Sequence, residues 1–359
     1  MRRGPAQAAF PQERLSFTPP LRYTAGNEIR HPMKSSQSRR SFFKKSMAVT
    51  VAAPLVTSLE EYALTAQEAP PPTRPGSPPR ATLPTGTIGK VKISRLICGG
   101  NLISGYAHSR DLIYVSKLLK SYFTEEKIME TWALSEAHGV NTMIFNPSDR
   151  RALAIYRKYR AQGGKIQCLA QLDPAKSRIE PVIKEAVDAG VVGAVLVGNL
   201  GDAWTREGDL DSIAKFIAVA KGQGIIAAVG GHELRTPMAV EKAGLKPDFY
   251  MKTLHSENYW SARKPDQMKE VIDNYGIDNY WCLDPEGTIR FFSELERPWI
   301  AYKVLAAGAI QPEAGFTHAF ANGADFCVVG MFDFQVEENV ATANRVLVDT
   351  KNRERSWVA

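Results

Sequence analysis

The feature that most constrains the fold is a regular alternation of short apolar runs and amphipathic segments from about residue 87 onward. The apolar runs are rich in Val, Ile, Leu and Ala without strict alternation, which is typical of parallel strands buried on both faces. Eight such units in roughly 260 residues match the size of a closed parallel barrel. We therefore predict an α/β fold, a single (β/α)8 TIM barrel over residues 87–350, with an open doubly wound sheet as the alternative. The eight predicted strands are Ser94–Asn101, Thr142–Asn146, Gln167–Asp173, Gly193–Gly198, Ile225–Gly230, Phe249–His255, Trp299–Ala306 and Phe326–Met331.

Residues that begin and end helices lie between these runs. Thr124 precedes a predicted helix that ends at Gly139, and a Thr side chain in this place caps exposed N–H groups. Pro312 begins another predicted helix, which ends at Gly323. The segment Cys98–Asn101 after the first strand lacks the GxGxxG spacing of dinucleotide-binding sheets, which favours the barrel.

The first 66 residues carry the pattern of a targeting signal. Residues Ser38–Lys44 read Ser-Arg-Arg-Ser-Phe-Phe-Lys, the twin-arginine motif, and a short apolar stretch and small residues up to Ala66 follow. We predict an N-terminal extension and twin-arginine signal over 1–66, with Met33 as a candidate for the true start. The protein is then exported to the periplasm or another extracytoplasmic place, and the twin-arginine translocase is a transient partner.

Two further segments bound the barrel. Residues 67–86 are dense in proline, which indicates an extended, disordered linker, and residues 351–359 form a short polar tail. No apolar stretch reaches the length of about 18 residues that a bilayer span requires, so we expect no stable transmembrane segment beyond the signal.

Charge excludes one class of partner. Of the net charge of +7, residues 1–66 contribute +6, with 10 Lys and Arg against 4 Asp and Glu, while the rest holds 35 against 34. A nucleic-acid binder needs clustered basic residues, and the nearly neutral body has no such stripe. We therefore expect a small-molecule substrate rather than a nucleic acid.

Two lysines lie inside predicted apolar strands, Lys252 in the sixth and Lys303 in the seventh. An amine deprived of water is a candidate nucleophile, and a second cation nearby favours this further. The pair resembles class I aldolases of the deoxyribose-phosphate aldolase type. The resemblance implies that Lys252 forms the imine and that Lys303 modulates it; ion-paired support of the fold is the alternative for both.

Histidines and carboxylates follow two adjacent strands. His232 and Glu233 come after the fifth strand, and His255 and Glu257 come after the sixth. Two His and two carboxylates suit a divalent metal such as Zn, Mn or Fe. The same two histidines are candidate catalytic residues beside the lysines, and hydrogen bonding alone is the alternative.

Substrate contacts are expected from the loops that follow the strands, because active sites of such barrels lie there. Glycines at the ends of the last two strands would let backbone N–H groups approach an anionic or hydroxylated group, and close packing is the alternative for them. The candidate substrate-binding residues are Asn101, His108, Asn146, Asp173, Gly308 and Gly330.

The start of the body resembles aldo-keto reductases. Residues Gly86–Leu96 look like their opening hairpin, and Glu136–Thr142 is similar to the turn before their second strand. The resemblance implies the barrel fold and NADPH-dependent reduction. That family places a catalytic Asp after the second strand and a Tyr soon afterwards; here Asn146 follows the strand, and no aligned Tyr is present.

These observations predict an exported TIM-barrel enzyme that acts on a small carbonyl or carbohydrate-derived substrate, with lyase or isomerase chemistry. A divergent NADPH-dependent oxidoreductase of the aldo-keto reductase type is the first alternative. A metal-dependent sugar enzyme and a catalytically inactive ligand-binding barrel are the others.

Overall fold

The computed structural model describes residues 83–108, 112, 114–264 and 281–359. The predicted twin-arginine signal and the predicted linker up to residue 82 lie outside the described residues. These parts stay predictions, whereas the last residues of the predicted linker, 83–86, belong to the fold: Leu83 is buried and a strand begins at Thr85.

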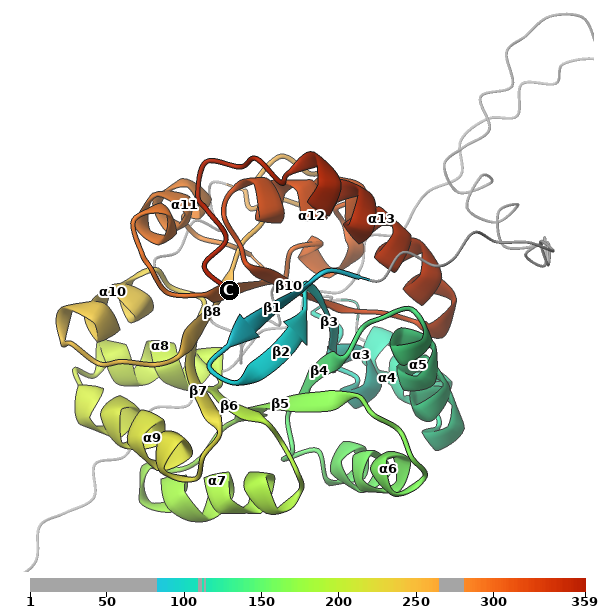
Figure 1. Ribbon diagram of the computed structural model, residues 1–359, viewed down its shortest axis with the longest axis horizontal. Coiled ribbons are helices and arrows are strands. Elements are labelled where there is room, and N and C mark those ends of the chain that lie inside the picture. The colour runs from blue at the N-terminus through green and yellow to red at the C-terminus, as the bar shows by residue number, and fades with distance from the viewer. Residues whose placement is uncertain (1–82, 109–111, 113, 265–280) are drawn as a thin grey trace, which may run out of the picture. The chain divides into compact units, whose positions relative to one another are not determined.

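Eight parallel strands close into a barrel, which confirms the predicted fold (Figure 1). Each strand pairs with its neighbours in chain order, and the last strand pairs with the first. Every predicted strand is present, with its ends shifted by a few residues. The barrel strands are β3 (Leu96–Gly99), β4 (Thr142–Phe145), β5 (Gln167–Leu172), β6 (Gly193–Leu196), β7 (Ile226–Gly231), β8 (Phe249–Thr253), β9 (Trp299–Tyr302) and β10 (Phe326–Gly330).

Helices cover the outside of the barrel (Figure 1). Their ends follow local chemistry: Thr124 accepts a hydrogen bond from Lys127 N as predicted, and Gly139 and Gly323 adopt the left-handed conformation after their helices. The α-helices are α3 (Asn101–Ser104), α4 (Val115–Tyr122), α5 (Glu125–Ala137), α6 (Arg150–Ala161), α7 (Ile179–Asp188), α8 (Gly198–Arg206), α9 (Leu210–Gly222), α10 (Arg235–Lys242), α11 (Pro285–Ser293), α12 (Pro312–Ala321) and α13 (Val336–Asp349).

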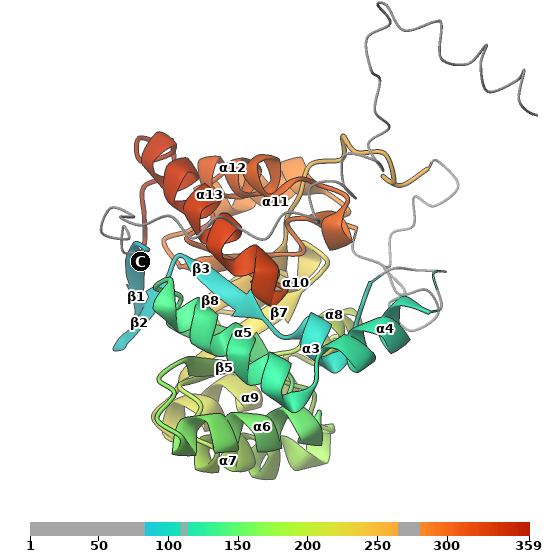
Figure 2. The same ribbon diagram turned by 90° about the vertical axis from the view of Figure 1, so that its right-hand side faces the viewer.

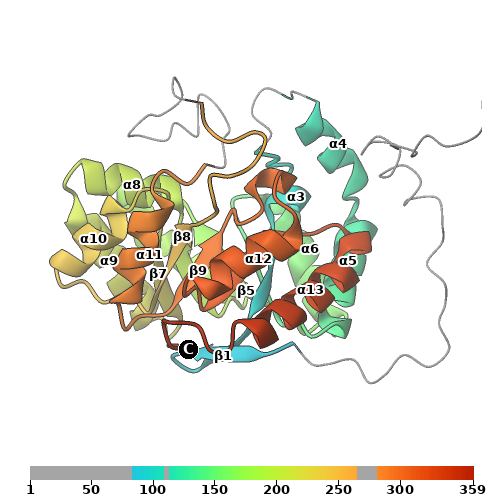
Figure 3. The same cartoon turned by 90° about the horizontal axis from the view of Figure 1, so that it is seen from above.

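A two-stranded hairpin closes one end of the barrel. Strands β1 (Thr85–Ile88) and β2 (Val91–Ser94) pair antiparallel, as the predicted opening hairpin requires. Ile88 and Ile93 are buried in the same apolar cluster as the inward-facing strand residues, so the hairpin plugs the floor. Figures 2 and 3 show α3 and α4 at the opposite end, where the strands finish.

Strand residues divide into two apolar clusters, because successive side chains point to opposite faces. On β8, Phe249 and Met251 belong to the cluster inside the barrel, whereas Tyr250 belongs to the cluster between the barrel and the helices. On β9, Tyr302 belongs to the inner cluster. This alternation decides which candidate side chains face the barrel axis.

The last nine residues, the predicted polar tail, contact the barrel through buried charged side chains. Asp325 is fully buried between Arg353 at 3.2 Å and Arg355 at 2.9 Å. Arg353 also stacks on the Trp357 ring, 3.5 Å from its centroid. The residues after α13 are therefore packed against the barrel and contribute to its structure.

Within the described ranges, no helix has both the length and the apolar character to cross a bilayer. The four cysteines are buried free thiols.

Candidate functional site

A buried histidine–aspartate pair lies at the ends of β6 and β7. His232 follows β7 directly, and Asp202 lies on α8, the helix after β6. His232 Nδ1 lies 2.9 Å from an Asp202 carboxylate oxygen, and both side chains are almost fully buried. Because an ionised carboxylate only accepts hydrogen bonds, Nδ1 carries the proton and Nε2 is the acceptor of the ring.

Asp202 organises the whole turn after β7. Its carboxylate also accepts hydrogen bonds from the backbone N–H groups of His232 and Glu233 and from the Thr236 hydroxyl at 2.6 Å. A carboxylate with this many donors cannot rotate without breaking several hydrogen bonds. The imidazole is therefore held in one orientation and one tautomer.

The environment keeps the histidine neutral. Burial lowers the pKa of His232 to about 4; the hydrogen bond to Asp202 opposes this, and the positive charge of Lys303 adds to it. Burial alone would raise the pKa of Asp202, but the hydrogen bonds from His232 and Thr236 outweigh it and hold that pKa below its usual range. The pair is thus a neutral imidazole bound to a carboxylate anion. This is the protonation state in which a general base can accept a proton.

Glycines allow the helix and the strand to approach closely enough to form this pair. A Cβ at Gly201 would lie 2.1 Å from the Gly230 carbonyl oxygen, so only glycine lets α8 rest on the end of β7. A Cβ at Gly231 would lie 3.1 Å from the Asp202 carboxylate. Glycine at positions 201 and 231 therefore leaves free the space that a Cβ would occupy.

Tyr302 faces the same space from β9. Its ring centroid lies 5.5 Å from that of His232, and its hydroxyl donates a long hydrogen bond of 3.4 Å to the Gly231 carbonyl. Burial raises the pKa of the phenol well above its ordinary value, and the negative charge of Asp202 adds to this. The site thus holds a protonated phenol beside a neutral imidazole.

Lys252 lies on the other face of its strand. Its neighbour Tyr250 packs in the outer cluster, and by alternation Lys252 also starts outside the barrel. It is 1% exposed, and its ammonium group donates to the carbonyl and hydroxyl oxygens of Thr253 at 3.0 and 2.9 Å. Cys282 Sγ is 4.0 Å away, and no carboxylate of the described residues pairs with Lys252.

Lys303 comes directly after β9 with a backbone φ of 59°. A lysine with left-handed backbone angles is strained. This backbone conformation changes the direction in which the side chain leaves the end of the strand. Its charge lowers the pKa of His232, which places its ammonium group within electrostatic reach of the imidazole. The same turn ends at Gly308, which has a φ of 92° and whose Cα faces open space.

His255 holds two neighbouring segments together. Its Nδ1 lies 2.8 Å from the Ser256 carbonyl oxygen, and its Nε2 lies 2.9 Å from the backbone N of Cys282. These partners assign a neutral ring, with Nδ1 donating and Nε2 accepting. Both nitrogens are engaged, so His255 fixes the segment before α11.

The two candidate metal-binding carboxylates face arginines. Glu233 pairs with Arg206 and with Arg235, and Glu257 pairs with Arg263 at 2.8 Å. Over the described ranges, no group of three or more His, Cys, Asp and Glu side chains is arranged to hold a metal ion. In this arrangement both carboxylates are engaged by arginines, and the metal site stays a prediction.

Four of the six candidate substrate-binding residues lie after β3, β4 and β5. Asn101 Nδ2 lies 2.7 Å from His108 Nε2. Asn146 accepts a hydrogen bond from Ser148 N at 2.9 Å, and Asp173 accepts one from the Ser148 hydroxyl. Strands β3–β5 lie across the barrel from β7–β9, so these residues do not belong to the His232 cluster.

Gly330 serves close packing. A Cβ there would lie 2.9 Å from the Leu102 side chain, and Gly99 on the next strand would clash with the Gly330 backbone at 2.8 Å if it carried a Cβ. Glycine at both positions lets β3 and β10 meet, with Leu102 over them.

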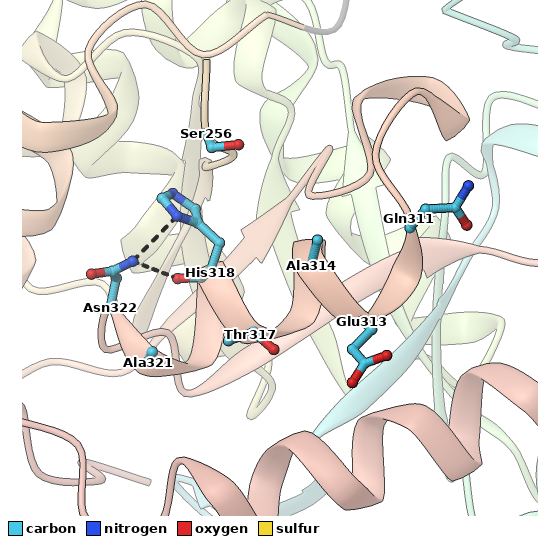
Figure 4. A pocket seen from close by; sticks show the side chains of 8 residues that line it. All are labelled: Ser256, Gln311, Glu313, Ala314, Thr317, His318, Ala321 and Asn322. Atoms are coloured by element: carbon cyan, nitrogen blue, oxygen red, sulfur yellow. Dashed lines mark hydrogen bonds between the residues drawn. The ribbon is translucent and has the colours of Figure 1, made fainter. Parts of the chain in front are cut away.

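Two surface hollows lie outside this cluster. Figure 4 shows one of about 710 Å³ beside α12, lined by Ser256, Gln311, Glu313, Ala314, Thr317, His318, Ala321 and Asn322. The other, of about 210 Å³, lies between the segments after β4 and β5 and includes Asp173 and Arg178.

Sequence reasoning missed two members of the site, Asp202 and Tyr302. Tyr302 lies within the apolar strand predicted over Trp299–Ala306, and Asp202 lies in a polar stretch without a recognisable motif. The signal that could have found Asp202 is the pairing of Gly198-x-x-Gly201-Asp202 with Gly230-Gly231-His232, because glycine pairs on adjacent units indicate close backbone approach.

Comparison with known proteins identifies the fold. No protein-family model and no curated protein matches the chain. Two structures of provisionally assigned aldo-keto reductases from Pseudomonas aeruginosa align with TM-scores of 0.53 and 0.52, at 16% and 15% identity. Each alignment covers 75% of this chain and 98% of the other.

A truncated 3-deoxy-D-arabino-heptulosonate 7-phosphate synthase from Thermotoga maritima aligns at 11% identity and a TM-score of 0.44, over 75% of this chain and 93% of the other. At 16% and 15% identity, the two alignments with the Pseudomonas aeruginosa structures show the TIM-barrel fold alone.

Proposed function

We propose that this protein is an enzyme that transfers protons on a small carbonyl or carbohydrate-derived substrate, with isomerase or lyase chemistry. The observation that carries the proposal is the His232–Asp202 pair, buried at the carboxyl ends of the barrel strands with the imidazole neutral. Active sites of TIM barrels lie at that end.

His232 acts as the general base. Its Nε2 accepts a proton from the substrate, and Asp202 stabilises the imidazolium that forms while keeping the ring in place. Isomerase and lyase reactions both need such a step, because a C–H or O–H bond next to a carbonyl must lose its proton.

Lys303 supplies positive charge at the site. When a substrate carbon or hydroxyl loses its proton, negative charge develops on oxygen, and a nearby ammonium group stabilises it. Covalent catalysis through Lys252 or Lys303 is the second candidate chemistry. It is favoured by the burial of Lys252 without a carboxylate partner among the described residues, because buried lysines of this kind serve as Schiff-base nucleophiles.

No step of the proposal passes through a metal or a nicotinamide. The donors named for a metal face arginines or backbone groups, and NADPH-dependent reduction is supported only by likeness of fold. The proposal of export rests on the twin-arginine pattern around Arg39 and Arg40.

The test is proton exchange. The full chain is incubated in D2O with a panel of small aldehydes, ketones and sugars, and NMR records loss of C–H signals and appearance of products. His232→Asn is expected to abolish the exchange, and Lys215→Ala on the exposed side of α9 serves as the control. Panel-wide absence of His232-dependent exchange or cleavage would overturn the proposal.

Borohydride trapping with the same panel separates the two chemistries. Covalent labelling that Lys252→Met or Lys303→Met removes would establish the imine route. Exchange without any labelling would establish acid–base catalysis by His232 alone.

A further inference from the structure

Helix α4 carries an exposed apolar stripe at the end of the barrel where the strands finish. Tyr114, Leu118 and Tyr122 recur every four residues, and Leu118 N donates a hydrogen bond to the Tyr114 carbonyl across one helical turn. Side chains at this spacing lie on one face of a helix. The three residues are 60%, 60% and 38% exposed. Figures 2 and 3 show α4 projecting beyond the barrel at this end.

The apolar side of α4 is wider than the barrel covers. Leu119 is buried in the outer core cluster and Val115 packs partly against that cluster, so these two residues hold the helix in place. Leu118 and Tyr122 lie beside them on the part that the barrel leaves in solvent. Phe334 extends this part, because it is 62% exposed and its ring centroid lies 6.4 Å from that of Tyr122. A contiguous exposed apolar surface marks an interaction site, whereas single exposed apolar residues are normal.

The charges beside the stripe are positive. α4 contains Lys117 and Lys120 and no acidic residue. Both lysines are exposed, and neither has an ion pair within the part of the chain that the structure describes. Near the C-terminal end of α4, Asp333 and Glu130 both bind Lys127, at 2.9 and 2.7 Å. Their negative charge is therefore partly neutralised, and the surface of α4 itself is cationic.

We infer that α4 and Phe334 dock on the surface of a lipid bilayer that contains anionic headgroups. Leu118 and the aromatic rings enter the boundary between headgroups and acyl chains, where tyrosine is favoured because it joins an apolar ring to a polar hydroxyl. Lys117 and Lys120 bind the anionic headgroups, as lysines on the polar side of interfacial helices do. The two lysines without an acidic neighbour in α4 favour an anionic surface over a second copy of the chain. The inference is independent of the proposed function.

A fluorophore on the stripe tests the docking directly. The four native cysteines are buried, so Leu118→Cys supplies an accessible thiol for an environment-sensitive dye on the full chain. Met238→Cys is the matched control, because Met238 is 48% exposed on α10 but has charged Arg235 and Glu241 one turn away on either side. Labelled chains are mixed with vesicles of phosphatidylcholine alone, or of phosphatidylcholine and phosphatidylglycerol. The dye reports its own position, so lipid binding by the predicted signal in residues 1–66 does not mimic the result.

We expect the dye at position 118 to brighten and shift to the blue on the vesicles with phosphatidylglycerol, and to respond weakly on phosphatidylcholine alone. The dye at position 238 should not respond. Joint Lys117→Glu and Lys120→Glu substitution in the chain labelled at 118 should weaken the apparent vesicle affinity about 10–100-fold, because two attractive charges become repulsive.

The charge control reverses two lysines elsewhere. Joint Lys215→Glu and Lys242→Glu substitution changes exposed lysines of α9 and α10 and should leave the response at position 118 unchanged. Equal responses at positions 118 and 238 would overturn the docking surface, and equal responses on both kinds of vesicle would overturn the role of anionic lipid. A blue shift at position 118 that grows with protein concentration without vesicles would overturn the lipid and assign the stripe to a second copy of the chain.

Discussion

Asp202 holds His232 through a side-chain hydrogen bond of 2.9 Å, although the two residues come from different strand–helix units of the barrel. The pair exists because α8 lies directly on the end of β7, so its geometry depends on tertiary packing rather than on any local motif. The proposed catalysis and the stability of the fold therefore depend on the same contact.

Asp202→Asn should lower both activity and stability. An amide cannot accept from every donor that surrounds the carboxylate, so at least one donor loses its partner, at a cost of about 1–3 kcal/mol in the free energy of unfolding. The preferred tautomer of His232 is lost as well, and kcat should fall roughly 10²–10⁴-fold. Urea unfolding and steady-state kinetics measure the two effects. Unchanged kcat in a folded variant would remove Asp202 from the mechanism.

The pH dependence of kcat/KM should reflect the pKa of His232. Because burial lowers the pKa of His232 to about 4, the base stays neutral in weak acid, and kcat/KM should persist to about pH 5 and fall as the pH drops through 4. An ordinary histidine would lose activity near 6.5. A pH–rate profile between 3.5 and 8 distinguishes the two, and an acidic limb near 6.5 would contradict the assignment.

The same shift predicts acid destabilisation. A histidine with a lowered pKa binds its proton more readily in the unfolded chain, so its contribution to stability is complete above pH 6.5 and is lost as the pH falls towards 4. The loss should reach about 3 kcal/mol at pH 4. Thermal unfolding of the wild type and of His232→Asn across this window measures it; parallel curves would contradict the shift.

The fold was predictable because its signals are local. Eight apolar runs and the residues that begin and end helices, such as Thr124 and Gly139, determine strand and helix positions without knowledge of the partners. The barrel then follows from counting the units. The opening hairpin was recognisable for the same reason.

The site was only partly predictable because it depends on which face of a strand points inward. β8 is buried on both faces, so its sequence does not distinguish Lys252 from Met251. Met251 packs inside the barrel, whereas the Lys252 ammonium group donates hydrogen bonds to Thr253. Residues Gly198–Arg206 contain two glycines and still form α8, in which Trp204 is buried. Packing against β7 overrides the low helix propensity of its glycines.

Gly201→Ala tests the close contact between α8 and the end of β7. The new Cβ would lie 2.1 Å from the Gly230 carbonyl oxygen, so the helix must move, and we expect a loss of about 1–3 kcal/mol in the free energy of unfolding together with lower activity. Gly222→Ala at the end of α9 is the matched control, because nothing lies within 4 Å of its Cβ. It should leave activity intact and stability equal or slightly higher. Equal stability of the two variants would show that α8 does not rest on this contact.

Removal of residues 351–359 should destabilise the barrel although they are distant from the chemistry. Asp325 is fully buried, and Arg353 and Arg355 supply its charge partners, so truncation leaves a buried carboxylate without them. Removing one side of a buried ion pair costs about 3–5 kcal/mol. Asp325→Asn in the full chain should reproduce much of this loss, because two guanidinium groups are then buried without an anion.

Lys351→Ala, which changes an exposed side chain of the same segment, should have almost no effect. Urea unfolding of the truncated chain, Asp325→Asn and Lys351→Ala measures the three changes under one condition. If truncation were as harmless as Lys351→Ala, the segment would not hold the barrel floor, and the contacts of Asp325 would contribute nothing to stability.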